Sequence, residues 1–297
     1  MKPQTMLVEA TAFNLIKQAV IFLPRDVKNA LAGAYAEETS EVAKTQLKTI
    51  LTNIAMAEEQ QIPMCQDTGV LTFYVRAGNK VRELDRLQEA FTEAVRKATF
   101  EVPLRPNAVD PFTQKSSADN TGRLIPQVQL EITSGDCLEI TVMAKGGGSE
   151  NVSALGMLAP SEGVKGLMRF VIDAVVKAGA QPCPPTILGI GVGGGADVAM
   201  SLAKKSLLLP LNVTNNDPEI AQLERELLEA ANMTGIGPMG LGGRTTALGV
   251  HVDYAFRHPA SYPVAVAFNC WASRRASARI HADGNVEYIT HQFRGKE

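Results

Sequence analysis

The sequence lacks the features that mark membrane proteins and nucleic-acid-binding proteins. No window of its 297 residues is apolar for long enough to cross a bilayer, because the stretch at residues 8–23 is interrupted by Glu9, Asn14, Lys17 and Gln18. The formal net charge is −2, and no dense basic stretch is present. We therefore expect a cytoplasmic protein with no membrane span and no nucleic-acid partner.

Cysteine is scarce and widely spaced. The four cysteines stand at positions 65, 137, 183 and 270, and none forms a C-x-x-C pair, so a zinc ribbon or a thioredoxin-like site is unsupported. A cytosolic protein of this size does not normally use such cysteines for disulfides.

The composition predicts a soluble globular fold of the α/β class. Hydrophobic residues make up 45% and charged residues 20%, which is enough for a large core. Residues 6–60 show helical periodicity broken at Pro24, and strands and helices alternate beyond them. We expect a single large mixed α+β domain, residues 1–297, with a helical N-terminal part and glycine-rich loops around the site.

Three local patterns give finer predictions. Residues 127–132 and 138–144 read as strands of a hairpin, and residues 279–289 read as a second hairpin that turns at 283–285. Ser161 has the character of an N-cap for a helix that runs to residue 178.

The glycine run Gly191–Ala196 fits G-x-G-x-x-A between a strand and a helix, the pattern of a dinucleotide-binding loop. A nicotinamide-dependent oxidoreductase is therefore one hypothesis. The acidic residue that such a site requires about 20 positions later is missing, since only Asp217 follows, after a polar turn. Glycines that allow close helix–sheet packing are the better interpretation.

Cys65, Cys183 and Cys270 share a setting that Cys137 lacks. Each of the three falls in a loop or at the end of an element, where a side chain can turn toward a site, whereas Cys137 opens a strand and resembles a small apolar residue. The spacing alone identifies no metal.

Six separated motifs resemble, in order, those of the class I fumarase and tartrate dehydratase α-type family. The resemblance covers residues 10–285. The motifs are Pro63-Met64-Cys65-Gln66-Asp67-Thr68-Gly69, Leu104-Arg105-Pro106-Asn107-Ala108-Val109, Lys145-Gly146-Gly147-Gly148-Ser149-Glu150-Asn151, Cys183-Pro184-Pro185, Gly237-Pro238-Met239-Gly240-Leu241-Gly242-Gly243 and Cys270-Trp271-Ala272-Ser273-Arg274-Arg275.

The resemblance implies an oxygen-sensitive hydro-lyase with a [4Fe–4S] cluster on Cys65, Cys183 and Cys270. Electron-transfer clusters normally take four cysteines, so three ligands leave one iron open as a Lewis acid. The implied reaction is reversible hydration of a dicarboxylate double bond, in which cations and N–H donors stabilise an enediolate.

The chemistry of the motif residues offers candidates for these roles, and the resemblance adds His258; the alternatives are an ion-pairing structural role for Arg105 and capping of the next turn for Asp67. Arg105 is expected to bind a substrate carboxylate, Gln66 to donate through its amide, and Gly148 to offer a backbone N–H. Asp67 is expected to exchange a proton with the departing hydroxyl, and His258 to orient Asp67 or share its proton.

The remaining basic residues receive structural roles. His251, His281 and His291 are interpreted as structural. For Arg274 and Arg275, pairing with acidic neighbours at a subunit contact is the default interpretation, with tuning of the cluster or substrate binding as alternatives.

The family occurs as one fused chain or as separate α and β subunits, and this sequence ends soon after its third cysteine motif. We therefore expect a β subunit, in an α2β2 assembly, that supplies further catalytic residues. The Ser-Glu-Asn ending of the third motif favours fumarate and malate, with tartrate and mesaconate as rivals. A non-catalytic regulatory subunit is a further hypothesis, and it predicts eroded motif residues that this sequence does not show.

Overall fold

The computed structural model describes residues 4–291, whose contacts divide them into two compact units. Unit 1 consists of residues 4–24, 54–146 and 274–291, and unit 2 consists of residues 25–53 and 147–273. Neither unit is continuous in the sequence, because the chain leaves and re-enters each of them. The expectation of a single domain stays a prediction.

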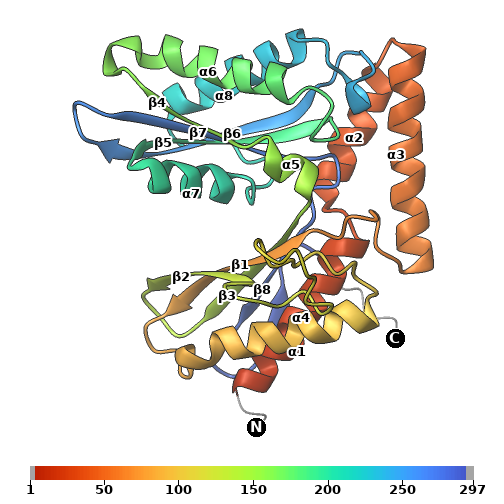
Figure 1. Ribbon diagram of the computed structural model, residues 1–297, viewed down its shortest axis with the longest axis vertical. Helices are drawn as coiled ribbons and strands as arrows, with labels where there is room; N and C mark the ends of the chain where they lie inside the picture. Colours follow the sequence, from red (N-terminus) through yellow and green to blue (C-terminus); the bar gives the residue numbers. More distant parts are fainter. Residues whose placement is uncertain (1–3, 292–297) are drawn as a thin grey trace. The chain divides into compact units, whose positions relative to one another are not determined.

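Unit 1 is built on a five-stranded sheet in the order β2-β1-β3-β8-β9, with helices α1 and α4 packed on one face (Figure 1). Strand β1 pairs with β2 in parallel and with β3 antiparallel. The elements of this unit are α1 Gln4–Ile21, β1 Val70–Gly78, the 3-10 turn Leu84–Arg86, α4 Leu87–Glu101, β2 Gln127–Thr133, β3 Leu138–Lys145, β8 Arg275–Ile280 and β9 Val286–Tyr288.

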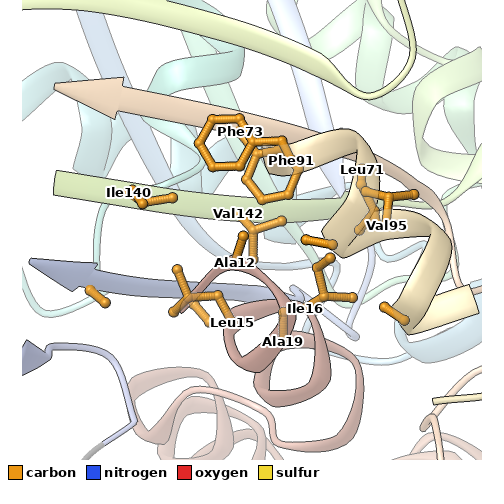
Figure 2. Packing of buried hydrophobic residues seen from close by; sticks show 14 of the residues in the cluster. Ala12, Leu15, Ile16, Ala19, Leu71, Phe73, Phe91, Val95, Ile140 and Val142 are labelled. Carbon is orange, nitrogen blue, oxygen red and sulfur yellow. The ribbon is translucent and has the colours of Figure 1, made fainter. Parts of the chain in front are cut away.

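The core of unit 1 lies between this sheet and its two helices. Leu15 and Ile16 of α1 are fully buried against the sheet, as Figure 2 shows. Phe91 of α4 stacks on Phe73 of β1 with ring centroids 4.2 Å apart. Burial of one such side chain contributes about 1.5–3 kcal/mol to the free energy of folding. The core therefore holds β1 and β3 in place.

The predicted hairpin of residues 127–132 and 138–144 is wrong in its pairing. Both strands form, but β1 lies between them and pairs with each. The second predicted hairpin is confirmed, since β8 and β9 pair antiparallel and Gly284 in their turn has φ of 85°.

Unit 2 has three layers, with a four-stranded sheet in the order β4-β7-β5-β6 between α7 on one face and α6 and α8 on the other (Figure 1). Helix α3 begins in this unit and ends in unit 1. The elements are α2 Arg25–Glu37, α3 Glu41–Gln60, α5 Gly147–Asn151, β4 Ala154–Leu158, the 3-10 turn Pro160–Glu162, α6 Gly163–Ala178, β5 Thr186–Gly194, α7 Ala196–Ser206, α8 Pro218–Met233, the 3-10 turn Pro238–Gly240, β6 Ala247–Arg257 and β7 Tyr262–Asn269.

The glycines of β5 are packing residues, as the better interpretation of the glycine run predicted. A Cβ atom on Gly189 would stand 2.1 Å from the carbonyl oxygen of Ala203 in α7, and one on Gly191 would stand 1.9 Å from that of Ala199. Asp197 lies in the first turn of α7, where its carboxylate disfavours a pyrophosphate. These close approaches allow α7 to pack directly on β5.

The helix of residues 163–178 does not use Ser161 as its N-cap, so that prediction is wrong. A 3-10 turn precedes α6, and the side chain of Glu162 accepts a hydrogen bond from the Ala159 N–H at 2.9 Å. With helices and strands mixed in both units, the predicted α/β class is confirmed.

Among the described residues, one helical stretch, Thr5–Glu37, is long and apolar enough to span a membrane by composition. Its apolar window is 56% buried, and α1 supplies core residues of unit 1. The core helix of a soluble protein has the same properties, so this stretch is weak support for a span.

Candidate functional site

In unit 1, three motif segments meet at one end of the sheet. Val70 at the start of β1 pairs with Lys145 at the end of β3, and Met143 of β3 pairs with Arg275 at the start of β8. The 65–69 loop, Gly146 and Arg274 therefore lie at the same end of the sheet.

Hydrogen bonds to its carboxylate hold Asp67 at this end of the sheet. Its Oδ1 accepts from the Gly69 N–H at 2.9 Å and from the Asn107 side-chain amide at 3.0 Å. The φ of Gly69 is 83°, and a Cβ atom there would stand 2.8 Å from the Lys145 backbone, so the turn requires glycine. A Cβ atom on Gly146 would lie 3.0 Å from Asp67 Oδ2. The carboxylate is thus fixed beside the end of β3.

The irregular stretch at residues 101–125 carries Arg105 and Asn107 to the same place. The Thr68 hydroxyl accepts from the Arg105 N–H at 3.0 Å. Buried Asn120 donates to the Arg105 carbonyl oxygen at 3.1 Å and accepts from the Asn107 N–H at 2.6 Å. These contacts order a segment that has no periodicity.

Gln66 and Arg105 present side chains that are available to a ligand. Both residues are exposed, and in the described part of the chain neither side chain makes a hydrogen bond or an ion pair. The Arg105 backbone is hydrogen-bonded to Thr68, the residue after Asp67, and an uncommitted guanidinium on this segment suits a carboxylate substrate.

Arg274 differs from its predicted role at a subunit contact. Its side chain is only 2% exposed, and its Nη1 donates to the Asp67 carbonyl oxygen at 2.5 Å. Arg275 is also buried. Arg274 therefore supports the 65–69 loop from within unit 1, a role that no local pattern indicates.

In unit 2, four motif segments gather at one end of the sheet. Ile187 near the start of β5 pairs with Asn269 at the end of β7, and Ala154 of β4 pairs with Val266 of β7. The segments beside these strand ends are residues 147–151, 181–185, 237–246 and 270–273.

Backbone hydrogen bonds join the loops of Cys183 and Cys270. The Trp271 N–H donates to the Cys183 carbonyl oxygen at 3.2 Å, and the Met239 N–H donates to the Pro184 carbonyl oxygen at 2.7 Å. Both cysteines are partly exposed and form no disulfide. Two thiols on adjacent, partly exposed loops suit the ligand chemistry of an iron–sulfur cluster.

Cys65 lies in unit 1 and is also a partly exposed free thiol. Within either unit, no three His, Cys, Asp or Glu side chains of the described residues gather as a site for a single metal ion. The three-cysteine ligand set therefore stays a prediction.

Gly148 stands in the short helix α5, with its backbone exposed. A Cβ atom there would lie 2.7 Å from the Gln181 carbonyl oxygen, so this position needs glycine to approach the Cys183 loop. Glu150 of the same motif pairs with Lys204 of α7 at 2.5 Å. The role of Gly148 as a backbone N–H donor to an anion remains a prediction.

His258 lies in the exposed turn between β6 and β7, whereas Cys270 follows the opposite end of β7. Eight strand residues separate these ends, a length of roughly 26 Å. The His258 Nδ1 accepts from the Ala260 N–H at 3.1 Å. Its predicted pairing with Asp67 involves residues of different units and stays a prediction.

Cys137 lies at the other end of the unit 1 sheet, directly before β3. Its thiol donates to Asp136 at 3.5 Å and lies 3.8 Å from His281 Nδ1. Desolvation, with the hydrogen bond to Asp136, raises the pKa of the Cys137 thiol. Cys137 is thus partly exposed and hydrogen-bonded rather than a small apolar residue, and its separation from the cluster ligands stays a prediction.

Glu38, which the sequence did not single out, holds the glycine-rich loop before β6. Its carboxylate accepts from the N–H groups of Thr39 at 2.8 Å, Ser40 at 3.0 Å and Arg244 at 2.8 Å. Burial acts to raise the pKa of Glu38, but these N–H groups outweigh it and hold the pKa below its ordinary value. The same loop contacts Pro184 through Met239.

We expect Glu38→Gln to destabilise unit 2 by about 1–3 kcal/mol at pH 7, because one N–H group loses its acceptor. Since the folded pKa is lowered, this stability is full above the ordinary glutamate pKa and is lost as the pH falls through the folded value. Thermal unfolding from pH 7 downward measures both effects. Glu41→Gln, at an exposed position in α3, is the control. If Glu38→Gln and Glu41→Gln had the same unfolding temperature at each pH, the role assigned to Glu38 would be contradicted.

The chain as a whole is similar to known proteins. Residues 9–279 match the fumarate hydratase (Fumerase) family, and the chain belongs to that family of hydro-lyases.

Among named relatives, a Methanocaldococcus jannaschii protein with the provisional name L(+)-tartrate dehydratase subunit alpha is 47% identical over 285 residues, which are 95% of this chain and 100% of the relative. The L(+)-tartrate dehydratase subunit alpha of Escherichia coli strain K12 is 37% identical over 91% of this chain and 89% of the relative. The "subunit alpha" in these names implies a partner subunit.

Proposed function

We propose that this chain is the cytoplasmic α subunit of an oxygen-sensitive fumarate hydratase that interconverts fumarate and malate with a separate β subunit, in an α2β2 assembly. The observation that carries the proposal is the fixed Asp67 carboxylate, together with the exposed, uncommitted side chains of Gln66 beside it in sequence and of Arg105, whose backbone is hydrogen-bonded to Thr68. A site for a hydroxy-dicarboxylate needs a charged group, a hydrogen-bond donor and a group that transfers a proton.

Cys65, Cys183 and Cys270 are the residues that would hold a [4Fe–4S] cluster. With three protein ligands, such a cluster supplies a Lewis acid that polarises the carbon–oxygen bond to be broken. The paired loops of Cys183 and Cys270 support this assignment.

The chain's own residues would divide the remaining work. Arg105 binds one substrate carboxylate with its planar guanidinium, and Gln66 donates an amide N–H to a carboxylate oxygen. In dehydration, Asp67 gives its proton to the departing hydroxyl while a base that the β subunit would supply takes the proton from the adjacent carbon, and both transfers reverse in hydration. Gly148 offers a backbone N–H to the enediolate charge, and His258 is the proposed orienting partner of Asp67.

L(+)-tartrate is the second candidate substrate, and the names of the relatives favour it. Malate and L(+)-tartrate, the substrates of the two dehydration reactions, differ by one hydroxyl group, and such a difference typically changes discrimination by only ~1–3 kcal/mol. The Ser-Glu-Asn ending of residues 149–151 is the feature that favours fumarate.

An anaerobic assay of the assembled complex tests this choice. We expect kcat/KM for malate and fumarate to exceed that for L(+)-tartrate by at least about tenfold, with mesaconate as a third substrate. A higher kcat/KM for L(+)-tartrate than for malate and fumarate would identify the enzyme as a tartrate dehydratase instead. An iron-loaded complex that turns over none of the three would contradict the proposal, and nicotinamide binding without iron would favour an oxidoreductase.

A further inference from the structure

The irregular stretch of unit 1 contains an ordered projection, residues 109–118, which we name the tongue. All ten of its residues are exposed. Phe112 stands at its tip and is 93% exposed. The exposure of this aromatic ring requires an explanation, because its burial would contribute about 1.5–3 kcal/mol of favourable free energy.

Hydrogen bonds within the tongue keep Phe112 from folding back. The Asp110 carboxylate accepts from the N–H groups of Phe112 at 3.0 Å and Thr113 at 2.7 Å and from the Thr113 hydroxyl at 3.0 Å. The Asp110 N–H donates to the Lys115 carbonyl oxygen at 2.9 Å. Hydrogen bonds from Thr113 and Phe112 lower the pKa of Asp110, so the carboxylate that orders the turn is ionised at neutral pH.

The base of the tongue is continuous with the site. The Ser117 N–H donates to the carbonyl oxygen of Ala108 at 3.0 Å. Ala108 is 8% exposed and follows Asn107, whose amide holds Asp67. The tongue therefore begins two residues after Asn107, the residue whose side chain holds Asp67.

We propose that Phe112 is the anchor through which the partner subunit docks on this chain, inserting into an apolar pocket of that subunit. This inference rests on the proposed function, which requires a partner subunit at the site. A rigid aromatic anchor loses little conformational freedom on binding, and aromatic side chains in pockets carry much of the energy of protein interfaces. Lys115 makes no side-chain ion pair in the described residues, so acidic groups at the rim of the pocket complement the tip. A second copy of this chain is a less suitable occupant, because it would not bring the residues that the β subunit is expected to add.

The test is equilibrium binding of the purified chain, loaded with iron under anaerobic conditions, to its β-type partner. We expect Phe112→Ser to raise the Kd by at least about 30-fold, the size of an interface hot spot. Its iron content, its far-ultraviolet circular dichroism and kcat at saturating partner should not change. Phe256→Ser is the matched control, since Phe256 is 95% exposed but lies in unit 2; its Kd should equal that of wild type.

Asp110→Ala keeps the aromatic ring and removes the acceptor that orders the turn, so a smaller rise of Kd is expected. A photo-crosslinking phenylalanine analogue at position 112 should join the partner subunit; crosslinks to a second copy of this chain would overturn the inference. A wild-type Kd for Phe112→Ser, or an equal loss in Phe256→Ser, would also overturn it. Binding is read without activity, so a complex that depends on Phe112 but lacks hydratase activity would refute only the proposed function.

Discussion

Cys183→Ala should abolish activity in the assembled enzyme and remove its iron and sulfide. The loop of Cys183 is joined to that of Cys270 by the Trp271 N–H, so both thiols are expected to serve one cluster. With a ligand missing, the cluster is not retained, and the proposed Lewis acid is lost with it. Iron and sulfide analysis, visible absorbance and fumarate hydration, all measured anaerobically, check this result.

Cys137→Ala is the matched control for this substitution. Cys137 is also a partly exposed free cysteine, but it lies at the other end of the unit 1 sheet from the 65–69 loop, and its thiol has a raised pKa. Iron content and activity should equal those of wild type. Loss of iron in Cys137→Ala, or its retention in Cys183→Ala, would contradict the assignment of ligands.

Local patterns in the sequence were sufficient for elements whose ends are marked by nearby residues. The β8–β9 hairpin is such an element, since it turns at Gly284 within the predicted turn of residues 283–285. The pairing of β2 was not predictable in this way. It depends on β1, which is about 50 residues earlier in the chain and which inserts between β2 and β3.

In the candidate site, too, some residues could be found from local patterns, whereas others depend on contacts between distant parts of the sequence. The motifs drew attention to Asp67, Arg105 and the cysteines, because these residues carry chemistry of their own. The residues that hold them in place, such as Asn120 and Glu38, act across 15 to 206 positions of sequence. Asn107 stood inside a recognised motif, but only the folded structure shows that its amide contacts the Asp67 carboxylate.

Asp67→Asn should lower kcat by about 10²–10⁴-fold, the usual contribution of a general acid–base group. The amide still accepts a hydrogen bond from the Gly69 N–H, so the loop is expected to keep its shape, but it cannot transfer a proton. Because Gln66 and Arg105 remain, KM should change little. Steady-state kinetics and iron analysis of the variant complex measure these effects.

Arg105→Ala provides the contrasting result that makes the Asp67 prediction specific. Removal of a guanidinium that binds the substrate carboxylate should raise KM, whereas loss of proton transfer acts on kcat. Asn107→Ala leaves the Asp67 carboxylate but removes one of the two donors that fix its Oδ1, so an intermediate loss of kcat is expected. If Asp67→Asn retained wild-type kcat with a full complement of iron, proton transfer would have to be assigned to another group. That group would have to come from the partner subunit or from elsewhere in this chain, and the roles of Gln66 and Arg105 in binding the substrate would be unaffected.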